Sequence, residues 1–442
     1  MILPPLTADE TPVDRLALGR FRWVSELISI DEARRRVLEA VRPLAAEEVR
    51  LDEALGRVLA EDVESPIDVP PFDSSAMDGY AVIAGPAVEL EIVGESRAGR
   101  PAKEPLRPGT AIRVSTGAAM PAGANAVVPL ERSEAGAAGR EADAAADAGG
   151  TPPVAGVGPG TSGRVRVQAS RPGDNVRRAG EDVRAGRVVL GAGLPLGPAE
   201  LGVAASVGRG TLRCSRRPEV AVLVTGDELT EPGEPLGDGR IYSSNGWALA
   251  AQVERAGALV ALRETVPDRP ADTRAALARA LDAAEVTLVS GGVSVGPHDH
   301  VKPALAELDV EERFWGVSLR PGKPTWFGAR DDRLAFGLPG NPVSAMVGFH
   351  LFVRPALAAL QGADPSAQSA RATLDEPIAR HPAREQAVRV RLESTGDGWH
   401  AAPTGPQGSH MLTSMLGAGA LARIAPGEGE VAAGERVEVE LL

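Results

Sequence analysis

Between residues 218 and 345, short apolar runs alternate with longer amphipathic stretches. The runs are rich in Val, Leu and Ala and have the length of buried strands, whereas the longer stretches repeat apolar residues at helical spacing. Strands that alternate with helices in this way predict right-handed βαβ units around a mostly parallel sheet. The expected strands are 219–224, 258–263 and 286–290, and the expected helices are 243–257, 270–284 and 342–360.

The N-terminal part of the chain is predicted to be helical. Ser29 is a suitable N-cap for a helix over 29–44, with Pro43 as its stop signal. A second helix is predicted at 50–63, where apolar residues again recur at helical spacing.

Two other regions have the texture of β domains. Residues 64–178 and those after about 367 contain short β-type runs separated by Gly and Pro. Within the first region, 135–163 consists almost entirely of Ala, Gly, Asp and Pro. That segment has too little apolar bulk to fold alone, so we predict a flexible insertion.

Length and charge narrow the class of protein. The chain has 442 residues, which is enough for about three domains of about 150 residues each. A formal net charge of −13 argues against nonspecific nucleic-acid binding, which needs a basic surface. It leaves a small anionic ligand open, because a local pocket can oppose the global field.

The cellular location is predicted from what the sequence contains. A single cysteine, Cys214, fits a reducing cytoplasm and is interpreted as a small buried hydrophobe rather than a nucleophile. The first residues have no apolar signal-peptide core, and no run reaches the roughly 18 apolar residues of a membrane span. We therefore expect a soluble, cytoplasmic protein.

In an open parallel sheet, ligands bind beyond the carboxyl ends of the strands, so the loops that follow strands are the candidates for chemistry. The first is TGDEL, from Thr225 to Leu229. Asp227 and Glu228 could hold Mg²⁺, which prefers one or two carboxylates together with phosphate oxygens of a substrate. The alternative is a turn or helix-start Asp beside a solvated Glu, and the motif alone does not decide.

The second loop, GGVSVGPHDH, follows the strand that ends at Ser290. Gly291, Gly292 and Gly296 would let the backbone approach a ligand closely and turn its N–H groups toward an anion. A zinc site at His298 and His300 would need further ligands, and the neighbouring sequence offers no paired Cys or His. The favoured interpretation is a phosphate cradle with Asp299 directed at a cation.

The third and fourth loops are RPGK and LPGNPVS. In the third, Pro321 and Gly322 suit a type II turn that would hold Arg320 and Lys323 on either side. The chain has three lysines against 44 arginines, which makes Lys323 more notable and favours an oxyanion site over a solvated hairpin.

In the fourth loop, Asn341 suits an N-cap and Pro342 the first helical position, with Ser344 in the first turn. The first turn of a helix presents free N–H groups to an anion. The same residues are equally explained as a plain helix start. Together, the four loops favour an anionic, phosphate-bearing ligand with a divalent metal.

A further cluster lies in the predicted β domain at 70–82, where Asp73, Ser75 and Asp78 occupy a turn before a strand. Small polar residues of this kind can be mere turn chemistry. A second carboxylate cluster in another domain nevertheless suggests a partner for the cleft.

Taken together, the motifs PFDSSAMDGYAV, TGDEL, SGGVSVGPHD, RPGKP, LPGNPVS and GPQGSHML resemble those of the molybdenum insertase family. Its members are the bacterial molybdopterin molybdenumtransferases of the MoeA type, and the gephyrin E domain is an animal relative. The motifs occur in consistent order over roughly residues 27 to 442. The resemblance therefore covers nearly the whole chain.

The resemblance implies a multidomain α/β plus β architecture. Its parts are a flexible tail (1–26), an extended helical domain in two pieces (27–63 and 179–211), an inserted β-rich domain (64–178), a molybdopterin-binding αβ domain with a mostly parallel sheet (212–365) and a C-terminal β-barrel (366–442).

The resemblance also implies an activity and an assembly. The expected reaction inserts molybdate into adenylylated molybdopterin, with Mg²⁺ as cofactor, and releases AMP and molybdenum cofactor. The family forms homodimers in which the inserted domain of one subunit faces the αβ cleft of the other, which would place Asp78 and Thr116 opposite Glu228 and Asp299. Transient contacts with other molybdenum cofactor biosynthesis proteins or apo-molybdoenzymes are expected, and none with nucleic acid or membranes.

The residues that match the family's motifs are assigned roles as hypotheses. The catalytic set is Asp78, Thr116, Asp182, Glu228, Asp268 and Asp299, and the metal set is Asp227, Glu228 and Asp299. The substrate- and anion-binding set is Gly291, Gly292, Ser294, Gly296, Arg320, Lys323, Pro339, Gly340, Asn341, Pro342 and Ser344.

Two departures bear on the anion site. Relatives often have lysines where this chain has Gly316 and Arg320; the arginine keeps the charge with a different geometry, whereas Gly316 removes a cation. Three other functions are weighed: a molybdopterin adenylyltransferase, which needs only the αβ domain; a tungstate-specific insertase; and a non-catalytic scaffold. The inserted and C-terminal domains argue against the adenylyltransferase, and the absence of a fused enzyme domain and a long linker argues against the scaffold.

Overall fold

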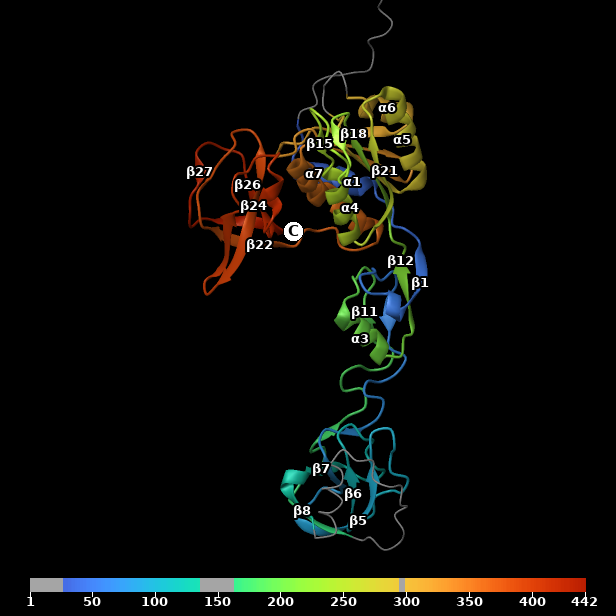
Figure 1. Cartoon of the computed structure of the whole chain (residues 1–442). Coiled ribbons are helices and arrows are strands. Elements are labelled where there is room, and N and C mark those ends of the chain that lie inside the picture. The colour runs from blue at the N-terminus through green and yellow to red at the C-terminus, as the bar shows by residue number, and fades with distance from the viewer. Residues whose placement is uncertain (1–26, 136–162, 294–298) are drawn as a thin grey trace, which may run out of the picture. The chain divides into compact units, whose positions relative to one another are not determined.

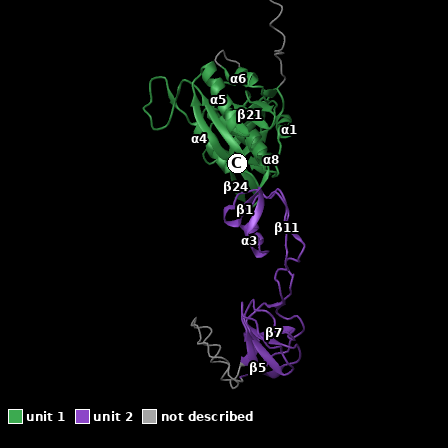
Figure 2. Ribbon diagram, turned by 90° about the vertical axis from the view of Figure 1, so that its right-hand side faces the viewer, with its two compact units in different colours: residues 1–46, 215–442 green, residues 47–214 purple. Residues whose placement is uncertain are grey.

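The fold was analysed in a computed structural model, which describes residues 27–135, 163–293 and 299–442 (Figure 1). The chain forms two compact units (Figure 2). Unit 1 comprises residues 1–46 and 215–442, and unit 2 comprises residues 47–214.

The centre of unit 1 is a six-stranded sheet with the order β16-β13-β17-β21-β20-β18. The first four strands are parallel, and β20 and β18 continue the sheet in antiparallel fashion. The mostly parallel sheet predicted from the alternating pattern is confirmed. The strands are β13 (Glu219–Thr225), β16 (Leu259–Val266), β17 (Val286–Ser290), β18 (Glu311–Trp315), β20 (Trp326–Arg330) and β21 (Arg333–Leu338).

Helices cover both faces of this sheet because the strands are apolar on both sides. On β13, Val220 and Val222 belong to the core beneath α1, α4, α7 and α8, whereas Ala221 and Leu223 belong to the core beneath α5 and α6. The result is a three-layer arrangement. The helices are α1 (Ile30–Ala40), α4 (Asn245–Arg255), α5 (Pro270–Ala283), α6 (Val301–Glu307), α7 (Pro342–Gly348) and α8 (Arg354–Leu360), and a short parallel pair, β14 (Leu229–Thr230) and β15 (Ile241–Tyr242), follows β13.

The predicted helix over 342–360 is present, with a π-helical segment, η3 (Phe349–Val353), between α7 and α8. By length and composition it could cross a membrane, but 78% of the window that meets this test is buried inside the protein. Burial of this extent is typical of the core helix of a globular domain.

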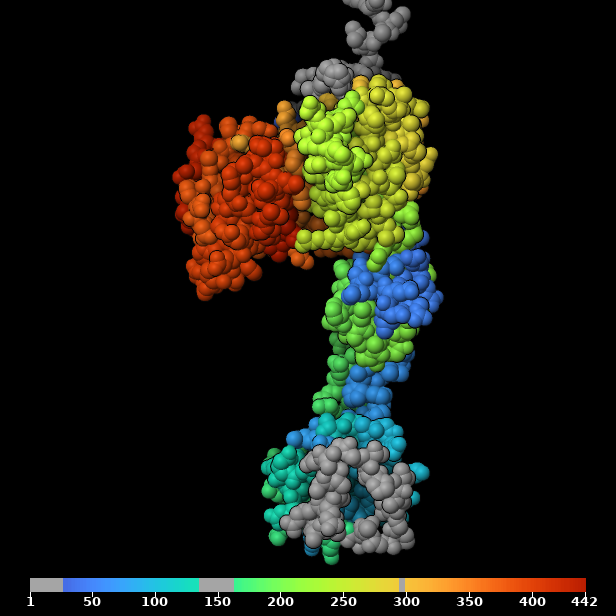
Figure 3. Space-filling model, viewed as in Figure 1, coloured from blue at the N-terminus to red at the C-terminus, as the bar shows by residue number. Residues whose placement is uncertain are grey.

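The C-terminal part of unit 1 is a closed five-stranded barrel with the order β24-β25-β22-β28-β26, in which β26 pairs back onto β24. The predicted β-barrel is therefore confirmed, and it forms a compact body, orange to red, beside the αβ layers (Figure 3). Its elements are β22 (Ser369–Leu374), β24 (Glu385–Thr395), β25 (Gly398–Pro403), β26 (Ala420–Ile424) and β28 (Arg436–Leu441), with β19 (Leu319–Arg320) alongside β24, a separate pair β23 (Ile378–Ala379) and β27 (Glu430–Val431), and a short turn of helix, η4 (Leu412–Met415).

Unit 2 contains the predicted β-rich domain, built on a six-stranded sheet with the order β7-β4-β6-β5-β9-β8. Two separate apolar clusters pack on this sheet: Tyr80 belongs to one and its neighbour Ala81 to the other, because successive residues of a strand point to opposite faces. The strands are β4 (Gly79–Val82), β5 (Val88–Ser96), β6 (Thr110–Val114), β7 (Ala126–Pro129), β8 (Ser133–Ala135) and β9 (Arg164–Val167), with η2 (Leu130–Arg132) after β7 and the pair β3 (Ser74–Ser75) and β10 (Val176–Arg177) nearby. Most of the predicted insertion 135–163 lies outside the described residues.

The other part of unit 2 corrects the prediction of an extended helical domain. Its elements are mostly strands: β1 (Ala46–Arg50) with β12 (Thr211–Ser215), and β2 (Val63–Glu64) with β11 (Val188–Leu190). The predicted helix at 50–63 is wrong: only η1 (Leu51–Glu53) forms, because Gly56 has φ +73° and the chain then pairs across to residues near 195 and 214. One helix, α3 (Pro198–Ser206), is present there.

Helix α1 also differs from its predicted place. It was assigned to the extended domain, but Ile30, Ala33 and Val37 are fully buried in the core of unit 1. Its N-cap is as predicted, because Ser29 Oγ accepts a hydrogen bond from the Glu32 N–H at 3.1 Å. Three apolar residues on one helix face require an apolar partner, which the αβ domain supplies.

Candidate functional site

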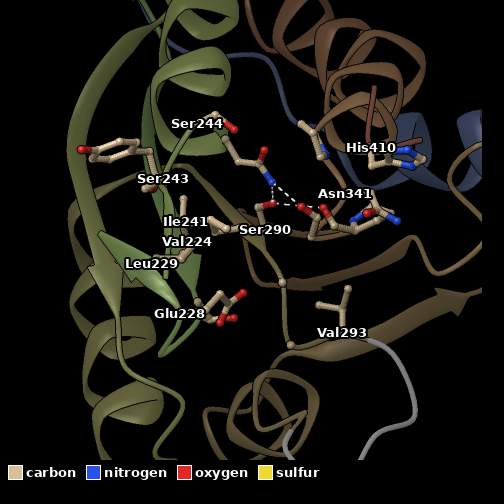
Figure 4. Close-up of a pocket in the computed structure, with 18 of the residues that line it drawn as sticks. Val224, Glu228, Leu229, Ile241, Ser243, Ser244, Ser290, Val293, Asn341 and His410 are labelled. Atoms are coloured by element: carbon tan, nitrogen blue, oxygen red, sulfur yellow. Dashed lines mark hydrogen bonds between the residues drawn. The ribbon is translucent and has the colours of Figure 1, made fainter. Parts of the chain in front are cut away.

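The strands β13, β17 and β21 are adjacent and parallel, so the loops that follow them emerge at one edge of the sheet. These loops enclose a cavity of about 650 Å³ (Figure 4). The structure thus brings together the first, second and fourth predicted loops. The cavity is lined by Val224, Thr225, Glu228, Leu229, Ile241, Tyr242, Ser243, Ser244, Asn245, Ser290, Gly291, Gly292, Val293, Asp299, Pro324, Pro339, Gly340, Asn341, Pro342 and His410.

The first loop contributes a carboxylate and a buried hydroxyl. Glu228 lines the cavity, and Thr225, the last residue of β13, is 8% exposed. Thr225 Oγ1 and Ser243 Oγ have no hydrogen-bond partner among the residues that the structure describes. Buried hydroxyls normally have partners, so these two are unusual among the residues that line the cavity.

Asp227 lies beside Asp268 rather than in the cavity lining. Its Oδ1 accepts a hydrogen bond from the Asp268 N–H at 3.2 Å. Partial burial raises the pKa of the Asp268 carboxyl, and the charges of Glu228 and Asp227 raise it further, against a hydrogen bond and His300 that lower it. Three carboxylates of this loop region are therefore close enough to repel one another.

The glycines of the second loop adopt the backbone geometry that the sequence predicted. Gly291 and Gly292 have φ values of +100° and +64°. A Cβ at Gly291 would lie 2.7 Å from Thr225 Oγ1, and one at Gly292 would lie 2.7 Å from Val301 Cγ2. The backbone therefore passes too close to its neighbours for any other residue. Ser294, Gly296 and His298 lie outside the described residues, and Asp299 lines the cavity.

The fourth loop is held by a side chain that the sequence analysis did not select. Asn245 Nδ2, at the start of α4, donates to Ser290 Oγ and to the Gly340 carbonyl, each at 2.8 Å, and Ser290 Oγ donates to the Pro339 carbonyl at 3.0 Å. Figure 4 shows these bonds between the elements that carry Ser290 and Asn341. No sequence signal singled out Asn245, because an Asn at a helix start is normally a cap.

Asn341 and Ser344 fit the prediction only in part. Asn341 occupies the N-cap position of α7, but its side chain makes no capping hydrogen bond. It is exposed and lines the cavity. Ser344 is 3% exposed within the helix and is not part of the lining in the described portion of the chain.

The third loop contributes differently from the prediction. The Arg320–Pro321 peptide bond is cis, and Gly322 has φ +121°, so the corner differs from the type II turn expected. Neither Arg320 nor Lys323 lines the cavity, although the adjacent Pro324 does. Lys323 is exposed.

Arg320 instead lines a second hollow, of about 280 Å³, together with Arg389 of β24. Arg389 is fully buried and has no carboxylate partner in the described ranges; it donates to Ser414 Oγ at 3.2 Å from Nε and 3.0 Å from Nη2. Burial lowers its pKa to about 10, so it remains cationic at neutral pH. A buried cation without a counter-ion favours an anion in the adjoining hollow.

The segment 408–410 contacts Arg389 of the smaller hollow and also lines the larger cavity. Arg389 Nη2 also donates to the Gly408 carbonyl at 3.3 Å, and His410, two residues on, lines the larger cavity. The sequence analysis did not select Arg389, because in AVRVRL it has the pattern of an ordinary strand residue.

The carboxylate arrangement fits Mg²⁺ held jointly with a ligand. Over residues 27–135, 163–293 and 299–442, no three His, Cys, Asp or Glu side chains form a group that could hold a metal by themselves. Glu228 and Asp299 both line the cavity. Mg²⁺ is commonly bound by one or two carboxylates plus phosphate oxygens, so a phosphate-bearing ligand would complete the site.

Three further residues have structural explanations. Lys302 is half-buried with its Nζ 4.5 Å above the Trp315 ring, and burial lowers its pKa against the opposing charges of Glu312 and Asp299. Gly316 has φ +89°, a backbone conformation that disfavours a lysine, and a Cβ there would lie 2.8 Å from Leu27 Cδ2. Cys214 is buried, and burial raises the pKa of its thiol, as expected for a residue that is not a nucleophile.

The remaining predicted residues lie in unit 2. Asp78 Oδ1 accepts hydrogen bonds from the Thr116 N–H at 2.7 Å and from the Thr116 hydroxyl at 3.3 Å. The structure thus brings these two together. Asp182 is exposed, and its backbone N–H donates to the Val69 carbonyl at 3.0 Å.

Three family descriptions match consecutive parts of the chain. Residues 28–208 match the MoeA N-terminal region (domains I and II), residues 221–359 match a probable molybdopterin binding domain, and residues 371–442 match the MoeA C-terminal region (domain IV).

Curated relatives match over nearly the full length. The chain is 35% identical to a molybdopterin molybdenumtransferase of Haemophilus influenzae, over 94% of this chain and 98% of the relative. It is 38% identical to molybdopterin molybdenumtransferase 2 of Mycobacterium tuberculosis, over 93% and 98%. Among solved structures, a molybdopterin biosynthesis MoeA protein from Pyrococcus horikoshii aligns with a TM-score of 0.77 at 29% identity, over 94% of this chain and 100% of that one.

Proposed function

The chain belongs to the MoeA family of molybdopterin molybdenumtransferases, and from that premise we propose that it inserts molybdate into adenylylated molybdopterin and releases AMP. Membership makes it a transferase of molybdenum cofactor biosynthesis. The observation that carries the proposal is the convergence of Glu228, Asp299 and the Gly291–Gly292 pair on one cavity.

The adenylylated substrate carries two linked phosphates, which suits this cavity. Gly291 and Gly292 allow the phosphates to approach the backbone closely, and the N–H groups at the start of the 342–360 helix favour anions. Thr225 and Ser243, whose hydroxyls have no protein partner among the described residues, line the same cavity.

Glu228 and Asp299, with Asp227 nearby, would hold Mg²⁺ together with the substrate phosphates. When bound, Mg²⁺ neutralises phosphate charge and polarises the phosphorus toward attack. The step that releases AMP adds one water to the phosphoanhydride: the water oxygen bonds to one phosphorus, and the bridging oxygen leaves with the other. Asp268, whose pKa is raised, is suited to accept the proton that the water loses.

Molybdate is a tetrahedral dianion and needs cations and hydrogen-bond donors. The hollow with Arg320 and buried Arg389 offers both, and Lys323 lies on the same corner as Arg320. We infer that the oxyanion binds there while the organic substrate occupies the larger cavity. Tungstate has nearly the same size and charge, so the alternative of a tungstate-specific insertase is tested with both anions.

We propose further that the protein acts as a cytoplasmic homodimer in which Asp78 and Thr116 of one copy complete the site of the other. Asp78 and Thr116 already form a hydrogen-bonded pair.

A mixture of two inactive variants tests the shared site. Asp78→Asn and Glu228→Gln should each be inactive alone. A refolded mixture of the two should recover about a quarter of wild-type activity, because about half of the dimers would contain one copy of each variant and would have one intact site. No recovery would refute the shared site. The proposal also assigns Asp182 to the catalytic residues. It includes transient contacts with other molybdenum cofactor biosynthesis proteins or apo-molybdoenzymes, and no contact with nucleic acid or membranes.

The direct test is incubation of the full chain with adenylylated molybdopterin, Mg²⁺ and either molybdate or tungstate. We expect AMP and the metal-loaded cofactor in equal amounts. The rival function, molybdopterin adenylyltransferase, would instead produce adenylylated molybdopterin from ATP and molybdopterin. Formation of that product, with no AMP released from the adenylylated substrate, would refute the proposal.

A further inference from the structure

Asn245 joins three elements of the cavity through one amide group. Asn245 is the first residue of α4 and is 7% exposed. Its Nδ2 donates hydrogen bonds to Ser290 Oγ and to the Gly340 carbonyl, each at 2.8 Å. Ser290 is the last residue of β17, and Gly340 follows β21. One side chain thus fixes the spacing between the ends of two neighbouring strands.

The Ser290 hydroxyl is fully used within this network. It accepts from Asn245 Nδ2 and donates to the Pro339 carbonyl at 3.0 Å. The hydroxyl proton is therefore committed to the protein and is not available to a ligand. Buried hydrogen-bond networks hold the elements that they join in one arrangement.

The network lies directly under the residues that face the cavity. Ser290 precedes Gly291 and Gly292, and Gly340 precedes Asn341. Because the C=O and N–H of a trans peptide point in opposite directions, anchoring the Gly340 carbonyl on Asn245 also fixes the direction of the Asn341 N–H. Both ligand loops are thus tied to one amide, in addition to the backbone hydrogen bond from the Gly291 N–H to the Leu338 carbonyl at 3.1 Å.

We propose that Asn245 is a positioning residue, which aligns the 290–292 and 339–342 loops for the adenylylated substrate without touching the reacting atoms. The predicted change in kcat/KM rests on the proposed function. The predicted change in amide hydrogen exchange is measured without substrate and does not rest on that function.

The sharpest variant is Asn245→Asp, which keeps the shape and removes both donated bonds. The matched control is Gln252→Glu on the same helix: Gln252 Nε2 also donates to a backbone carbonyl, that of Met346 at 3.3 Å, but away from the ligand loops. For Asn245→Asp we expect kcat/KM for adenylylated molybdopterin to fall by about tenfold or more, since small displacements of positioning groups have large effects. We expect KM for molybdate to change by less than about twofold, and Gln252→Glu to leave both parameters within about twofold.

Amide hydrogen exchange supplies the readout that is independent of activity. In Asn245→Asp, exchange should accelerate over residues 286–293 and 337–343, while Gln252→Glu should match the wild type there. If the wild-type chain shows no turnover, the proposed function fails, and exchange still decides the role of Asn245.

Ser290→Ala tests whether the network acts as a unit. Combined with Asn245→Ala, it should lower kcat/KM no further than the more damaging single change, because both remove the same alignment. Three results would overturn the proposal: equal exchange in Asn245→Asp and Gln252→Glu, an Asn245→Asp enzyme with unchanged kcat/KM, or additive losses in the double variant.

Discussion

Thr225 Oγ1 occupies the space that a side chain at Gly291 would need: a Cβ at Gly291 would lie 2.7 Å from it. Thr225 is the last residue of β13, and Gly291 directly follows the neighbouring parallel strand β17. Gly291 lines the cavity, and among the described residues the Thr225 hydroxyl has no hydrogen-bond partner. The geometry at this edge therefore depends on a glycine at 291.

Gly291→Ala should consequently remove AMP release and lower stability. The backbone at φ +100° disfavours any side chain, and the contact with Thr225 adds steric overlap, for a total of about 1–3 kcal/mol. Chemical denaturation and turnover would be measured together. Gly202→Ala in α3 is the control, because Gly202 has open space around it, and it should be neutral or stabilising by up to about 1 kcal/mol. An active, fully stable Gly291→Ala protein would contradict the account.

Removing either cavity carboxylate should abolish Mg²⁺-dependent AMP release. Asp299→Asn and Glu228→Gln keep the side-chain shape while each removes one negative charge from the metal site, so turnover should fall by about a hundredfold or more with an unchanged fold. Glu307→Gln is the matched surface control, since Glu307 pairs only with Arg274 at 3.1 Å among the described ion pairs. Release of AMP at the wild-type rate by Asp299→Asn would refute the metal assignment.

The second hollow should govern affinity for the oxyanion. Arg320→Ala removes an exposed cation, so the protein should fold normally while KM for molybdate rises several-fold or more and KM for adenylylated molybdopterin stays constant. Arg391→Ala, on the same strand as Arg389 and also exposed, should change neither value. Equal effects of the two substitutions would show that only general charge matters.

The barrel carries a pH-dependent contact that does not involve the site. The hydrogen bond from His400 Nδ1 to Asp375 at 2.8 Å raises the pKa of the imidazole, against partial desolvation, and Asp397 at 3.2 Å from Nε2 adds to the rise. Because the folded pKa is above the usual value of about 6.5, the stabilisation is complete below about pH 6.5 and is lost as the pH rises through the folded pKa.

His400→Gln should therefore lower the unfolding temperature more at about pH 5.5 than at about pH 9. Thermal unfolding of the wild type and the variant at both pH values measures the difference directly. A variant whose deficit is equal at the two pH values, or larger at the high one, would exclude the ion pairs as its cause.

The sequence predicted the αβ core well because periodicity reports burial directly. The alternation of EVAVLV, VTLVS and intervening helices required a buried parallel sheet, and the strand-end loops then had to meet. The prediction of a helix at 50–63 is wrong because the same apolar spacing also suits a chain that crosses between strands, and Gly56, with φ +73°, interrupts the helix.

The candidate site was predictable where a backbone constraint is written in the sequence, as at Gly291 and Gly292. It was not predictable where the role comes from distant partners. Asn245 meets Ser290 and Gly340 only in the fold, and Arg389 is distinguished by burial without a carboxylate partner in the part of the chain that the structure describes, which no spacing reveals.

The most direct test of the central claim is a crystal structure of the full chain grown with AMP, Mg²⁺ and tungstate, whose metal is located by its anomalous signal. The account predicts the AMP phosphate in the cavity between Gly291–Gly292 and Pro339–Pro342, and the tungsten separately, in the hollow of Arg320 and Arg389. Nucleotide bound away from that cavity, or tungsten bound anywhere other than the hollow of Arg320 and Arg389, would contradict it.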